Sequence, residues 1–215
     1  MPLFKTITVS DTTKVLIWKI EEDREVLEHG VELTGNCRTR LSGMKSEIHQ
    51  RGFLSVRHLL KAAGYCTQDL YYDGQGRPHL KDGSHISITH SFIFSGIIIS
   101  DEPVGIDIEM QRSKIGRIAA KFVDYEFSFL DTEQVRELTV VWCIKESLYK
   151  LFATEGLSFK DHTRVIPFSL SSNRAKAWVK YGGRMEKYQL EFAEFEGFTA
   201  AWALKDRVEN KKYLI

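Results

Sequence analysis

The N-terminal part of the chain alternates between short apolar runs and segments with apolar residues at helical spacing. Residues 14–20 are rich in β-branched and aromatic residues and predict a strand, and the acidic stretch after them predicts a helix that ends at Gly30. Residues 45–63 predict a second helix, with Ile48 among its apolar positions. The Gly and Pro residues within 71–78 predict a turn. This part of the chain is therefore expected to mix helices and strands.

The rest of the chain, from residue 85 on, begins with two apolar runs and ends in strand-like segments. Residues 85–100 predict two strands or one bent strand, and a turn leads into a strand that ends at Glu109. The chain then has helical spacing through Leu130, and a long helix is predicted over 132–152. Four strand-like segments occupy residues 164–204, with turns at the GG and EG dipeptides. The whole pattern predicts an α+β protein.

Composition limits the classes of protein that remain. The 215 residues are 43% hydrophobic and 27% charged, as in ordinary globular proteins, and the formal net charge is +1. This balance argues for neither nucleic acid nor a membrane surface as a partner. The N-terminus lacks the pattern of a signal peptide, and the three cysteines match no disulfide or zinc framework. We therefore expect a cytoplasmic protein with reduced thiols.

Two acidic residues lie one residue apart on a predicted apolar strand. Side chains at i and i+2 share a face, so Asp107 and Glu109 project together while Ile106 and Ile108 point the other way. An isolated pair of this kind is most simply explained as the solvent face of a strand. If the pair is buried, the two charges repel unless a cation lies between them.

The predicted long helix carries a lysine within its apolar face. At about 100° per residue, Lys145 lies in the middle of the apolar stripe and Glu146 at its edge. A buried ammonium needs an anion or a route to solvent. Glu146 and Lys150 are spaced as an ordinary surface ion pair, which explains them without any function. It does not explain Lys145.

Taken together, these residues have the composition of a metal and phosphate site. Three carboxylates with two lysines suit Mg²⁺ that bridges phosphate oxygens, rather than zinc or copper. Residues 36–64 add six basic side chains against one acid, Glu47. A solvated basic helix explains that segment equally well, but beside a phosphate site it favours a polyanionic ligand or an acidic partner.

Five short stretches resemble motifs of the 4'-phosphopantetheinyl transferases, one of them weakly. GIDIE at 105–109 and WCIKESLYK at 142–150 resemble the paired signature of that superfamily. GRPHL at 76–80 and ISITHS at 86–91 are similar to segments of its larger, surfactin-synthetase-activating branch, and RGFLSVR at 51–57 is a weaker match. Thr89 stands where that branch often has serine, so a hydroxyl is kept.

The resemblance implies an enzyme that moves phosphopantetheine from coenzyme A to a serine of an apo acyl or peptidyl carrier protein and releases adenosine 3',5'-bisphosphate. It implies Mg²⁺ as the metal, with Mn²⁺ as an alternative. The metal ligands would be Asp107, Glu109 and Glu146. The residues that contact the diphosphate or the attacking serine would be Lys145 and Lys150. The general base would be Glu126 or Glu146.

The resemblance also assigns residues to the nucleotide end of coenzyme A. The 3'-phosphate and adenine would be bound by Arg77, Thr89 and His90, with Arg57 and Arg51 nearby. Taken alone, His90 is better explained as a hydrogen-bonded core histidine. A docking patch for an acidic carrier would comprise Arg112, Lys114, Arg117, Ile115, Ile118 and Phe122. The same residues are equally explained as one amphipathic helix.

The length resembles that of the larger branch, in which two similar α+β halves form one chain. We expect an N-terminal half at 1–104, which binds the nucleotide, and a C-terminal half at 105–215, which carries the metal and catalytic motifs. The halves would be related by a pseudo-twofold axis, with the site in the cleft of a monomer. Two other functions stay open: a Mg²⁺-dependent phosphodiesterase or nuclease, and a non-catalytic module that binds coenzyme A or a carrier.

Overall fold

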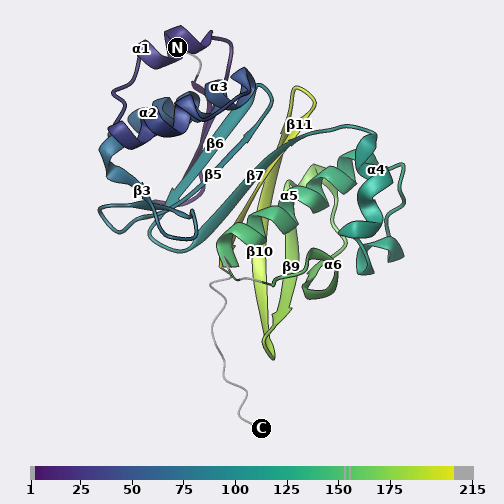
Figure 1. The fold of residues 1–215 in the computed structure, drawn as a ribbon. Coiled ribbons are helices and arrows are strands. Elements are labelled where there is room, and N and C mark those ends of the chain that lie inside the picture. Colours follow the sequence, from purple (N-terminus) through teal and green to yellow (C-terminus); the bar gives the residue numbers. More distant parts are fainter. Residues whose placement is uncertain (1–2, 153, 155, 206–215) are drawn as a thin grey trace.

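The computed structural model describes residues 3–152, 154 and 156–205 of the chain. Two antiparallel sheets, each with a long helix packed on one face, lie side by side (Figure 1). The expected α+β class is confirmed. In the described part of the chain, no helix is long and apolar enough to cross a membrane.

The first sheet has four strands in the order β1-β2-β6-β5. Their bounds are Leu3–Thr8 for β1, Lys14–Lys19 for β2, His85–Ser91 for β5 and Phe94–Ser100 for β6. The helices before β5 are α1 (Arg24–His29), α2 (Gly35–Ser42) and α3 (Glu47–Ala62). Helix α3 buries Val56, Leu59 and Leu60 in a core that includes Leu16 and Ile97 of the sheet. A small hairpin of β3 (Leu70–Tyr72) and β4 (Pro78–Leu80) joins α3 to β5.

The second sheet has five strands in the order β7-β11-β10-β9-β8. Their bounds are Val104–Met110 for β7, Thr163–Val165 for β8, Arg174–Tyr181 for β9, Arg184–Phe195 for β10 and Phe198–Lys205 for β11. The helices are α4 (Lys114–Ile118), α5 (Val135–Phe152) and α6 (Phe159–His162), and 3₁₀ turns lie at Thr67–Asp69, Ala119–Lys121, Tyr125–Ser128 and Leu170–Ser172. Helix α5 covers this sheet as α3 covers the first (Figure 1).

Small residues let α5 lie close to the second sheet. A Cβ atom at Gly105 would come within 1.9 Å of the Ser147 carbonyl oxygen, so only glycine fits this position of β7. The Ser147 hydroxyl donates to the Ala201 carbonyl oxygen of β11 at 2.8 Å, and the Cys143 thiol contacts the Thr199 carbonyl oxygen. This close approach fixes the side chains that α5 presents next to β7.

The two sheets are joined by side-chain hydroxyls and by a shared apolar core. Ser87 and Thr89 of β5 accept hydrogen bonds from the backbone amides of Ile106 and Ile108 of β7, each at 3.2 Å. The core between the sheets includes Val15, Ile17, Phe94, Ile106, Phe198 and Trp202. The chain passes from one sheet to the other at β7, next to the expected boundary at 104/105. The pseudo-twofold relation stays a prediction.

Several sequence predictions needed correction. Residues 110–130 are not one helical stretch but the short α4 and two 3₁₀ turns, because apolar side chains there pack from an irregular backbone. Of the strand expected at 164–170, only the beginning pairs, as β8. Ile48 is 49% exposed instead of buried against the sheet. Of the two alternatives for residues 85–100, two strands are confirmed, because β5 and β6 pair across a tight turn at Phe92.

Candidate active site

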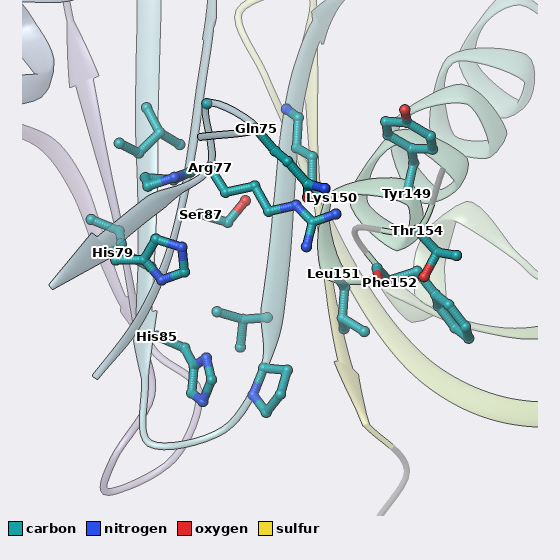
Figure 2. Close-up of a pocket in the computed structure, with 16 residues that line it drawn as sticks. Gln75, Arg77, His79, His85, Ser87, Tyr149, Lys150, Leu151, Phe152 and Thr154 are labelled. Carbon is teal, nitrogen blue, oxygen red and sulfur yellow. Dashed lines mark hydrogen bonds between the residues drawn. The ribbon is translucent and has the colours of Figure 1, made fainter. Parts of the chain in front are cut away.

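A pocket of about 710 Å³ lies between the first sheet with its hairpin and the C-terminal end of α5. We call it the cleft. Figure 2 shows Arg77 reaching from the hairpin toward α5, where Lys150 and Tyr149 lie on the opposite side of the pocket. Its size is typical of a site for a small molecule or nucleotide. The cationic Arg77 and Lys150, with the imidazoles of His79 and His85, favour an anionic ligand.

The turn that carries Arg77 is shaped by Asp73. Its carboxylate accepts hydrogen bonds from the backbone amides of Gln75 and Arg77, both at 2.9 Å, and from His79 at 3.1 Å. The bond from the Arg77 amide, followed by that from His79, lowers the pKa of Asp73 to about 2. Gly76 supplies the positive φ of 80° that the turn requires. The sequence GQGRP thus holds the arginine at the edge of the cleft.

Asp107 lies at the inner wall of the site, where β7 meets α5. It is 5% exposed, so the interpretation of its strand as a solvent face is wrong for this residue. Its Oδ1 atom lies 2.8 Å from the Lys150 ammonium and accepts from the Thr89 hydroxyl at 3.1 Å. Its Oδ2 atom is buried and has no hydrogen-bond partner among the described residues. An unpaired buried carboxylate oxygen requires a ligand to offset its desolvation.

Glu109 and Glu146 belong to the same electrostatic cluster. Burial and the charge of Asp107 raise the pKa of Glu109, while the Ser91 hydroxyl, which donates to it at 3.2 Å, opposes the shift. Burial, then the charges of Asp107 and Glu109, raise the pKa of Glu146 to about 7, although Lys150 opposes this. Three carboxylates that repel one another are a set that a divalent cation would stabilise.

The donor set fits Mg²⁺, but the described residues do not form a closed metal cluster. No group of three or more His, Cys, Asp or Glu side chains in the described ranges is arranged to hold an ion. The Oδ1 atom of Asp107 forms an ion pair with Lys150 instead. The orphaned Oδ2 atom of Asp107 and the raised pKa values of Glu109 and Glu146 are the observations that favour a cation. These three residues therefore remain the proposed ligands.

His90 lies next to a second histidine that the sequence did not single out. The rings of His49 and His90 are 5.9 Å apart, and Gly52 of α3 leaves room for the His90 ring. Partial burial, then the charges of His49 and Lys150, lower the pKa of His90, while Asp107 opposes the shift. His90 keeps exposed surface, so it is not a core histidine. His49 has no motif around it, and only the folded geometry identifies it.

Lys145 and Glu126 lie outside the cleft. Both side chains are 0% exposed, and their charged groups are 2.9 Å apart. Lys145 also donates to the carbonyl oxygens of Phe122 and Phe159 at 2.7 and 3.0 Å, and Glu126 accepts from the Val165 amide at 2.7 Å. The predicted anion for Lys145 exists, but it is Glu126 and not a diphosphate. In this conformation neither group can reach a substrate, so we assign them a structural role instead of the expected catalytic ones.

Arg51 and Arg57 do not line the cleft either. Arg51 donates to the backbone oxygens of Glu22 and Ile20 at 2.8 and 3.2 Å, which ties α3 to the loop after β2. Arg57 is 3% exposed and lines a separate pocket of the first half. Of the residues expected at the nucleotide end, the structure places Arg77 in the cleft and Thr89 and His90 on the strand β5 beside it.

Residues 103–204 match the family model described as the 4'-phosphopantetheinyl transferase superfamily. The matched part of the chain runs from β7 to β11 and is similar to that superfamily. It contains Asp107, Glu109, Glu146 and Lys150. A comparison with curated proteins found no match. The surfactin-synthetase-activating branch stays a prediction.

Proposed function

We propose, from the superfamily match and the geometry of the cleft, that the protein transfers 4'-phosphopantetheine from coenzyme A to a serine of an apo carrier protein. The observation that carries this proposal is the position of Lys150. Lys150 is one of the residues that line the cleft, and its ammonium lies 2.8 Å from Asp107. A phosphate in the cleft would therefore contact a cation that is held beside the acidic cluster, as phosphoryl transfer requires.

Coenzyme A would bind with its nucleotide end toward the hairpin. Arg77 reaches into the cleft from the turn (Figure 2). His90 of β5 lies next to His49 of α3. An incoming phosphate would favour the protonated form of His90, whose pKa is otherwise lowered. The motifs GRPHL and ISITHS, which carry Arg77, Thr89 and His90, support the larger branch of the superfamily.

The metal would be held by Asp107, Glu109 and Glu146, and Mg²⁺ would neutralise charge on the transferred phosphate. Lys150 would bind the diphosphate. Thr89 and Lys150 fix the Asp107 carboxylate through hydrogen bonds. Of the two candidate bases, Glu146 fits better, because it belongs to the acidic cluster, whereas Glu126 is fully buried in its ion pair with Lys145.

The carrier protein would dock on the basic side of the acidic cluster. A pocket of about 200 Å³ lies beside Glu109 and is lined by Ile115, Ile118 and Trp142, with Arg112 and Lys114 among its other residues. Residues 111–122 contain four basic residues and no acid. An acidic partner with an apolar side chain near its serine fits this surface. The monomeric state and the cytoplasmic location remain predictions.

Two other functions have weaker support. A Mg²⁺-dependent phosphodiesterase or nuclease would use the same acids to activate water, but it would have no need for the basic, apolar surface beside Glu109. A non-catalytic module would keep the cleft, but it would not need the unpaired Oδ2 atom of Asp107. The superfamily match of residues 103–204 favours transfer over both.

Incubation with coenzyme A, Mg²⁺ and an apo carrier protein tests the proposal by mass spectrometry of the carrier. A mass gain of one phosphopantetheine arm, with release of adenosine 3',5'-bisphosphate, is expected. Binding of coenzyme A without a mass gain for any of several carriers would support the module. Hydrolysis of nucleic acid or phosphodiesters without a carrier would support the hydrolase. Either result would reject transfer.

A further inference from the structure

A second pocket, of about 560 Å³, lies on the first half of the molecule between α2, α3 and the β3–β4 hairpin. We call it the arginine pocket. It shares no lining residue with the cleft. Three cationic side chains line it, Arg40, Arg57 and Lys81, and none of its described lining residues is acidic. The nearby Asp69 turns its carboxylate to the backbone amide and thiol of Cys66 instead.

Arg57 carries a buried charge without an acidic counter-ion. It is 3% exposed, and no carboxylate in the described part of the chain forms an ion pair with it. Its guanidinium lies 3.4 Å from the Phe53 ring centroid and donates to the Phe53 carbonyl oxygen at 2.9 Å. The Nε atom is buried and has no hydrogen-bond partner within residues 3–152, 154 and 156–205. A buried, unpaired guanidinium is unfavourable, and an anion in the pocket would offset this cost.

Arg40 and the start of α2 complete a surface suited to a phosphate group. The Arg40 guanidinium lies over the Tyr72 ring at 4.2 Å, which holds it at the pocket. Thr34 and Asn36, at the first turn of α2, also line the pocket, and a helix N-terminus favours anions. The two arginines and the lysine carry three positive charges, more than a single carboxylate would balance, and phosphate is an anion that guanidinium groups bind well.

The Cys37 thiol is the other candidate for the counter-charge. Its sulfur lies 3.7 Å from Nη2 of Arg57. Burial raises the pKa of the Cys37 thiol, but the hydrogen bond from Thr34 and the charge of Arg57 outweigh it, so the pKa lies below its usual value. A thiolate would balance one cation. It would leave Arg40 and Lys81 without an anion.

We propose that the arginine pocket is a second anion site, which binds a phosphate group independently of the cleft. The hairpin separates the two sites, because Tyr71 and Tyr72 of β3 pair with His79 and Pro78 of β4. Tyr71 and Tyr72 line the arginine pocket, and His79 and Pro78 line the cleft. An anion behind β3 would therefore lie one strand away from the turn that holds Arg77.

Calorimetric titration with inorganic phosphate tests this site. The protein is first saturated with coenzyme A, so that the cleft is filled and the remaining heat reports the arginine pocket. We expect Arg40→Gln to weaken phosphate binding about tenfold, since it removes one charge-assisted contact. Arg38→Gln is the matched control, because it removes the same charge from an exposed position of α2 outside the pocket. It should keep the wild-type affinity.

Three results would overturn the second site. Absence of phosphate binding would leave the Cys37 thiolate as the counter-charge. Equal losses in the two variants would show a diffuse charge effect. Competition between phosphate and coenzyme A would show that the pocket is part of the cleft. If the protein binds no coenzyme A at all, the proposed function fails, while the same two variants still test the arginine pocket in the free protein.

Discussion

The ammonium of Lys150 lies 2.8 Å from the Oδ1 atom of Asp107, which is its one ion-pair partner among the described residues. It also donates to the Ile106 carbonyl oxygen at 2.9 Å, so β7 and α5 hold it from two points. The side chain is 28% exposed and faces the cleft. One cation thus contacts both the acidic cluster and the space where an anionic substrate would lie.

Replacing Lys150 tests the proposed role of this cation. Lys150→Gln should lower kcat for transfer to an apo carrier by about 100-fold or more, because it removes a charge from the transferred phosphate. Lys180→Gln, which changes an exposed lysine of β9, should have no effect. Steady-state kinetics with both variants measures the difference. Near-wild-type kcat for Lys150→Gln would remove this lysine from the mechanism.

The raised pKa of Glu146 predicts a pH-dependent stability without metal. Its folded-state pKa is about 7, above the ordinary value of 4.5. The folded protein therefore holds this proton more tightly than the unfolded chain, and the resulting stabilisation is complete below pH 4.5 and is lost as the pH rises through 7. Glu146→Gln should flatten this dependence. Thermal unfolding at pH 5 and pH 8 measures it, with Glu133→Gln as an exposed control.

Mg²⁺ should offset the loss of stability that the wild type shows at high pH. At pH 8 the ion should raise the unfolding temperature of the wild type, because it stabilises the ionised carboxylates. It should have little effect on Glu146→Gln. An equal Mg²⁺ response in both proteins would argue against Glu146 as a ligand.

The buried pair of Lys145 and Glu126 predicts a loss of stability rather than of catalysis. Glu126→Gln should lower the free energy of unfolding by about 3–5 kcal/mol, because it leaves a buried ammonium without its counter-ion. Glu28→Gln breaks the surface pair with Arg24 and should cost about 0.5 kcal/mol or less. Denaturant unfolding gives both values. At low temperature, the folded fraction of Glu126→Gln should keep the wild-type rate of transfer. A lower rate per folded molecule would make Glu126 a candidate base again.

Phe92 predicts a contact with the carrier. It has a positive φ of 52°, is 40% exposed, and lies 4.8 Å from the Arg112 guanidinium beside the acidic cluster. A strained aromatic residue at this position suggests a binding role. Phe92→Gly should raise KM for the carrier about fivefold, leave KM for coenzyme A unchanged and keep or increase stability. Asn173→Gly is the control, because Asn173 has the same φ of 52° and lies just before β9. An unchanged carrier KM would contradict the contact.

The sequence predicted the site best where spacing alone sets geometry. The i, i+2 spacing of Asp107 and Glu109 put both acids on one face, and helical spacing put Lys145 inside the protein. The identity of its partner could not be predicted, because Glu126 comes from a 3₁₀ turn in an irregular segment with no periodicity. The partners of Arg57 and His49 depend on how α2, α3 and β5 pack, which local pattern does not encode.

The hydrogen bonds between β5 and β7, which join the two sheets, have a consequence for how this protein can change over evolution. The Thr89 hydroxyl of β5 accepts a hydrogen bond from the Ile108 amide of β7 and donates one to Asp107 at the same time. One oxygen atom thus serves both mechanical cohesion and the chemistry of the acidic cluster. A substitution that loosens one necessarily disturbs the other, so selection for a more rigid molecule and selection for a faster one act on the same position.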